Sequence, residues 1–142
     1  DNMKKKFCLF VSAIILFAMS SCGERKSIDV LAGEWNVISV GEMQIPDSVD
    51  AFIGFDVAKY LVYGCTGCNR LVAELPTKVN AGIPLFSTIG SSHKMCADMS
   101  VEEALLPAME EVVDFMIDDN KLYLLDTIGD TVVWLERRQD AL

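Results

Sequence analysis

Apolar and polar side chains alternate along several short segments of the chain, as they do in β-strands that bury one face. Residues 33–40 are the clearest case, because Trp35, Val37 and Ser39 would share one face of a strand. Glycine, Asp and Asn residues, which favour turns, separate many of these segments. The predicted strands are residues 33–40, 52–56, 60–64, 70–75, 83–86, 121–125 and 131–135, of which 52–56 and 60–64 should pair.

Helical periodicity is convincing over residues 100–113, where Ser100 and Glu103 have the spacing of a capping box. Pro107 lies inside this helix and should kink it, because proline has no N–H to donate to the Glu103 carbonyl. The glutamates on the other side, Glu102 among them, are expected to face solvent. The apolar stripe consists of Val101, Ala104, Leu105, Ala108, Met109 and Val112. The pattern predicts a mostly β fold of the α+β class, with seven or eight short strands and one helix.

The first residues have the pattern of a secretion signal. Three lysines precede an apolar run over residues 7–19, which is shorter than the roughly 20 residues of a membrane-spanning helix. The following segment, Met19-Ser20-Ser21-Cys22-Gly23, resembles a bacterial lipobox. The resemblance implies a signal peptide over residues 1–21, cleavage before Cys22 and lipid on the Cys22 thiol. Ordinary signal cleavage, with Cys22 left as a free thiol, is the alternative.

The lipobox resemblance also implies a location in the cell envelope. Residues 22–30 should then form a polar tether between the lipid and a domain over residues 31–138. Gly23 at the second mature position resembles the outer-membrane default of enteric bacteria. The lack of an acidic run after Cys22 favours the periplasmic face.

Length and charge limit the function classes. Removing residues 1–21 from the 142-residue chain leaves 121 residues, the size of one domain that needs no metal to fold. These carry 20 acidic and 9 basic residues, so their net charge is −11. Phosphate backbones repel such a charge, and we expect no nucleic-acid partner.

Three cysteines remain in the predicted domain, and they leave several chemistries open. Cys65 and Cys68 have CxxC spacing, and His93 and Cys96 could complete a zinc site. A redox-active dithiol is a second possibility. A structural disulfide is favoured over both, because an oxidising compartment favours disulfides and the CxxC lies between two predicted strands. His93 is the single histidine and no nucleophile motif surrounds it, so we predict no catalytic residue, metal or cofactor.

The same segment carries a family resemblance. Residues 62–71, Val-Tyr-Gly-Cys-Thr-Gly-Cys-Asn-Arg-Leu, resemble the Gly-x-x-Gly-Cys-Asn-Arg segment of META domains, the HslJ-like family. Residues 92–96, Ser-His-Lys-Met-Cys, resemble the later Thr-Arg-Met-x-Cys segment. The resemblance covers roughly residues 31–136. This chain departs from the family pattern at Ala73, where glycine is common, at Ser92 and His93, and at the additional Cys65.

The META resemblance implies a fold, a disulfide and a functional class. The fold would be a small curved antiparallel sheet or partial barrel packed by a single helix. Cys68 and Cys96 occupy the two cysteine positions of the family motifs and would form a structural disulfide. The motif residues are Gly67, Cys68, Asn69 and Arg70. The best-known bacterial member is linked to heat shock and envelope stress, without an established chemistry.

Three functional hypotheses follow from these observations. The first is a non-enzymatic META-type envelope lipoprotein, stress-related or a binding module, attached to the membrane through its lipid. Its further partner would be an envelope protein or a small ligand. The second is a small redox or metal-binding protein acting through Cys65, Cys68, His93 and Cys96. The third is a small-ligand binder that uses the mouth of the partial barrel.

Overall fold

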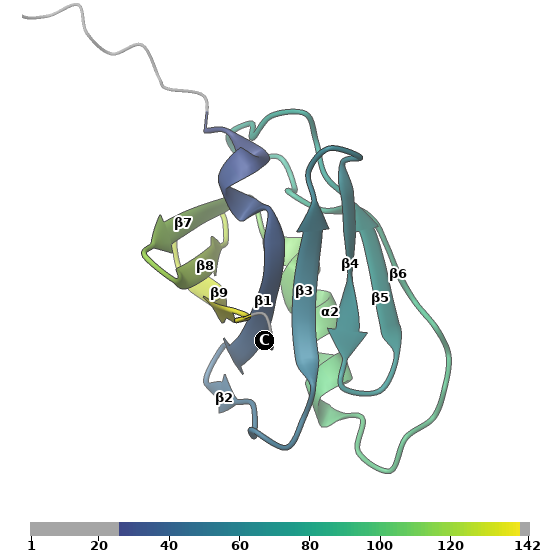
Figure 1. Ribbon diagram of the computed structural model, residues 1–142. Coiled ribbons are helices and arrows are strands. Elements are labelled where there is room, and N and C mark those ends of the chain that lie inside the picture. The colour runs from purple at the N-terminus through teal and green to yellow at the C-terminus, as the bar shows by residue number, and fades with distance from the viewer. Residues whose placement is uncertain (1–25, 140–142) are drawn as a thin grey trace, which may run out of the picture.

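The computed structural model describes residues 26–139. The predicted signal peptide, Cys22 and the first part of the predicted tether lie outside the described residues. Within residues 26–139, a curled antiparallel sheet forms a half-barrel that wraps around one α-helix (Figure 1). The elements are η2 (Ile28–Leu31), β1 (Gly33–Val40), β2 (Met43–Gln44), β3 (Ala51–Asp56), β4 (Leu61–Thr66), β5 (Arg70–Glu74), β6 (Ser87–Ser91), α2 (Ser100–Glu111), β7 (Asp114–Asp118), β8 (Lys121–Leu125) and β9 (Thr131–Arg137). The predicted fold class, mostly β with a single packed helix, is confirmed.

The strand order places the first strand in the middle of the sheet. It runs β6-β5-β4-β3-β1-β9-β8-β7, and β2 pairs only with β1. Gly33 of β1 pairs with Phe55 of β3, at the end of the half-barrel where η2 leads into β1, which we call the entry end. Ala51 pairs with Thr66 at the opposite end, beside the turn over residues 67–69, which we call the motif end.

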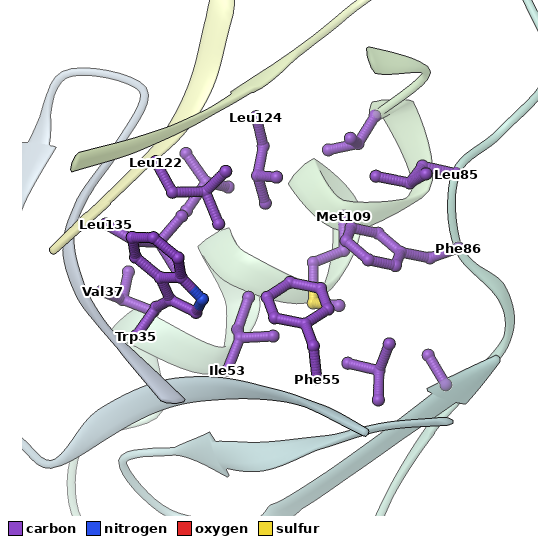
Figure 2. Packing of buried hydrophobic residues seen from close by; sticks show 14 of the residues in the cluster. Trp35, Val37, Ile53, Phe55, Leu85, Phe86, Met109, Leu122, Leu124 and Leu135 are labelled. Carbon is purple, nitrogen blue, oxygen red and sulfur yellow. The ribbon is translucent and has the colours of Figure 1, made fainter. Parts of the chain in front are cut away.

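The hydrophobic core lies between the inner face of the sheet and helix α2. Burial alternates strictly along β5 and largely along β1, which leaves one face of the sheet to solvent. Met109 of α2 points toward Phe55 and Phe86, whose rings stack 6.2 Å apart (Figure 2). The same core is lined by Trp35 of β1, Leu122 and Leu124 of β8, and Leu135 of β9, which are fully buried.

The chain packs against the domain earlier than the sequence predicted. The tether was expected to reach residue 30, but Ile28 and Leu31 are 4% and 0% exposed within the 3-10 helix η2. The Leu31 carbonyl accepts a hydrogen bond of 2.8 Å from the buried indole N–H of Trp35. A buried indole N–H is costly without a partner, so η2 completes the core and is not part of a free tether.

Three strands differ from the prediction, and one of them is the two-residue strand β2, which was not predicted. Residues 83–86 are not a strand, although Leu85 and Phe86 are buried as expected; the strand is β6, Ser87–Ser91. The strand β7 was not predicted, because its five residues begin almost directly after the helix and carry Asp114 and Asp118 at their ends. The apolar content of residues 83–86 suggested a strand where there is a buried loop, and the Asp residues of β7 hid a real strand.

The helix begins where predicted, but through a different cap. Met99 is the N-cap residue and makes no side-chain capping bond, so the expected capping box of Ser100 and Glu103 does not form. Instead Asp98 Oδ1 accepts a 2.9 Å bond from the Ser100 N–H. Hydrogen bonds from Ser100 lower the pKa of Asp98. Among residues 26–139, no helix is long and apolar enough to cross a bilayer.

Candidate functional site

The two motif segments meet at the motif end of the half-barrel and are joined by a disulfide. Cys68 lies in the turn between β4 and β5, and Cys96 lies in the loop that leads into α2. Their sulfur atoms are bonded at 2.04 Å, with the Cα atoms 6.0 Å apart. This is the pair implied by the META resemblance.

The side chain of Asn69, in the turn between β4 and β5, forms hydrogen bonds with the loop that contains Ser92 and Lys94. It is a polar residue only 2% exposed. Its side-chain amide donates to the Lys94 carbonyl at 2.9 Å, and its side-chain oxygen accepts from the Lys94 N–H at 2.8 Å and from the Ser92 hydroxyl at 2.9 Å. Both sides of the amide are therefore satisfied, and residues 92–94 are held in one position relative to the sheet.

Glu102 extends the same network to the helix. Its Oε1 atom accepts hydrogen bonds of 2.8 Å from both the Thr66 hydroxyl and the Asn69 side-chain amide. Thr66 Oγ1 in turn accepts the Asn69 backbone N–H at 2.9 Å. The sequence predicted a solvent-facing Glu102, but the side chain is half-buried and connects α2 to the turn. The bonds of Thr66 to Glu102 and of Ser92 to Asn69 were not predicted either, because these partners lie 36 and 23 residues apart and no spacing rule relates them.

Gly67 and Arg70 have backbone roles in the turn. Gly67 has φ +91°, and a Cβ atom there would lie 2.6 Å from Val49 Cγ1, so glycine is required on both grounds. The Arg70 N–H donates to Ser92 Oγ at 3.0 Å and its carbonyl accepts from the Ser92 N–H at 3.1 Å. The Arg70 side chain is exposed.

The zinc hypothesis needs the thiols of Cys68 and Cys96, and the redox hypothesis needs that of Cys68, but these two residues are joined in a disulfide in this structure. Cys68 and Cys96 are bonded to each other, so neither offers a thiolate to a metal. The CxxC pair is not the bonded pair, since Cys65 is free and half-buried in β4. His93 is exposed. Among the described residues, no three His, Cys, Asp or Glu side chains are grouped as metal ligands.

A cleft of about 550 Å³ lies away from the motif, beside Lys26. Its lining includes Lys26, Val79, Asn80, Val113, Asp114 and Leu125. The cleft is open and its lining is mixed in polarity, and none of the motif residues contributes to it. A small ligand at the barrel mouth would therefore be independent of the disulfide and the Asn69 network.

The motif end is thus a structural junction in which backbone turns, a disulfide and a buried amide fix the start of the helix on the sheet. Comparison with known families agrees with this geometry: the model of the META domain matches residues 28–139. The match begins at Ile28, where the helix η2 also begins. Neither curated proteins nor solved structures gave a match to this chain. Because the family model covers most of its length, the chain belongs to the META domain family.

Proposed function

We propose that this protein is a non-enzymatic lipoprotein of the cell envelope, anchored through Cys22 and acting as a stress-related binding module. Its partner would be an envelope protein or a small ligand. The placement we propose is the outer membrane, with the domain on the periplasmic face. The observation that carries the proposal is the lipobox-like segment ending at Cys22, which lies a few residues before the packed domain.

The disulfide supports an envelope location. Cys68 and Cys96 form a bond that persists in oxidising compartments and is uncommon in a bacterial cytosol. The net charge of −11 after signal removal supports a protein partner or small ligand over nucleic acid.

The internal use of the motif's polar groups supports a non-enzymatic role. A catalytic amide or carboxylate needs free bonding capacity toward a substrate. Asn69 directs its amide to Lys94, Ser92 and Glu102, and Glu102 receives Thr66 as well. These groups stabilise the junction between sheet and helix, so a partner would bind the shape that they maintain.

The anchor is tested by Cys22→Ser in the full chain expressed in a bacterial envelope. The unmodified protein should sediment with membranes and carry acyl mass by intact-mass spectrometry, whereas Cys22→Ser should be soluble and lack that mass. Cys65→Ser is the matched control, since it removes the free thiol of the folded domain and should leave sedimentation unchanged. Membrane association that survives Cys22→Ser would refute the anchor.

The stress role is tested separately in a deletion strain. Loss of the gene should lower survival at elevated temperature, and the unmodified protein should restore it. Restoration by the Cys22→Ser variant would show that function does not need the membrane.

A further inference from the structure

The point at which the chain enters the domain is fixed by Lys26. Its Nζ atom donates to Asp114 Oδ1 at 2.9 Å and to the Phe115 carbonyl, and it lies 5.0 Å from the centre of the Phe115 ring. These contacts attach Lys26 to the start of the edge strand β7.

Two loops with exposed isoleucines border the same place. The loop at 79–82 and the loop at 126–129 line the 550 Å³ cleft together with Lys26. Ile83, next to the first loop, is 56% exposed, and Ile128, within the second, is 79% exposed. We call Ile83 and Ile128 the apolar rim.

We propose that the apolar rim docks on the surface of the lipid bilayer, with Ile83 and Ile128 entering the interfacial layer. This inference rests on the proposed lipid anchor at Cys22. Only three residues separate Cys22 from Lys26. Even fully extended, four peptide steps span about 14 Å.

The short connection restricts which surface can reach the membrane. A domain of this size has a radius of gyration of about 13 Å, so its diameter is about 34 Å, more than twice the reach of the connection. Met95 is 81% exposed and would be an equally apolar contact, but it follows Lys94, which bonds to Asn69 at the motif end. Tether length therefore selects the apolar rim over Met95.

The charge near the rim indicates which lipids it would meet. Lys26 pairs with Asp114, but Asp126 also lines the cleft and the predicted mature chain carries a net charge of −11. An anionic lipid surface would therefore be repelled and a zwitterionic one favoured. Branched apolar side chains at loop tips bury readily in the headgroup and acyl boundary. Two such contacts add to an existing lipid anchor and orient the domain without the need for strong binding of their own.

The test uses the lipidated full chain in vesicles of phosphatidylcholine, with Cys65→Ser as the background. A fluorophore is attached through Ile128→Cys, Ile83→Cys or, as the control, Ser48→Cys, which lies in the exposed loop between β2 and β3. Sedimentation of the vesicles is measured in each sample. Quenching by a lipid-borne quencher at the depth of the first acyl carbons is then compared with quencher-free vesicles.

We expect sedimentation of all three proteins, with loss of fluorescence at positions 128 and 83 and none at position 48. Sedimentation without loss at 128 and 83, or with equal loss at 48, would overturn the docking while leaving the anchor intact. Failure to sediment would overturn the anchor and the docking together. The two proposals are thereby distinguished in one experiment.

Discussion

Replacing Asn69 by alanine tests whether the motif is a structural junction. The substitution removes four side-chain hydrogen bonds, two of them to Lys94, one to Ser92 and one to Glu102. A neutral bond contributes about 1 kcal/mol and a bond to a charged group about 2 kcal/mol. Because Lys94 and Ser92 are exposed, water can replace part of this, and we expect a loss of about 3–4 kcal/mol of unfolding free energy. For a domain of this length that lowers Tm by about 12–16 °C.

Urea and thermal unfolding of the purified domain, followed by circular dichroism, measure the loss. Asn80→Ala is the matched control, because Asn80 is exposed and its replacement should change stability by no more than about 0.5 kcal/mol. Asn69→Asp tests the donor side of the amide by itself. It keeps an oxygen that can accept from the Ser92 hydroxyl, but it replaces the N–H group that donates to Glu102 with a second carboxylate. Its stability should improve as the pH falls, since protonation relieves the repulsion. A loss below about 1 kcal/mol for Asn69→Ala would refute the junction.

Three further predictions follow from contacts already described or adjoining them. Cys68→Ser should cost about 3–4 kcal/mol by the chain-entropy model, because the bond closes a loop with a sequence separation of 28; reduction of the unmodified protein should give a similar loss in urea unfolding. Gly54→Ala should destabilise strongly, since a Cβ atom there would lie 2.2 Å from Tyr63 Cζ, and a double-mutant cycle with Tyr63→Ala should recover most of the loss. Burial, and then the hydrogen bond and charge of Glu34, raise the pKa of Tyr63 above 10.0, so this contribution to stability is complete below that pH and is lost as the pH rises through the raised pKa. An NMR titration of the Tyr63 ring should show the pKa fall toward its ordinary value in Glu34→Gln.

Local patterns predicted the strands well where one face is buried. The limits of β1 and β8 agree with the prediction, because each alternates buried and accessible residues. The pairing of β3 with β4 was also predicted from their adjacency. The buried pair Leu85 and Phe86 was mistaken for a strand, because an apolar pair buries equally well in a loop.

The candidate site was only partly accessible to sequence reasoning. Cys68 and Cys96 could be paired through the family resemblance, whereas spacing alone left zinc and redox chemistry open. Glu102 lies 33 residues from Asn69, and its place on the helix suggested a solvated face. Its contact depends on how α2 lies across the sheet, which is a tertiary property that no local pattern encodes.

The central position of β1 determines the order in which the domain can be completed. Val37 of β1 pairs with Leu135 of β9, almost a hundred residues later, so one side of the first strand stays unpaired until the last strand is available. Such distant pairing is slow to form because a long loop must close first. A chain threaded through an export channel from its N-terminus would thus keep its sheet open until nearly all of it had crossed. Loss of the final strand, by early termination or proteolysis, would leave β1 as an exposed edge for pairing with other chains.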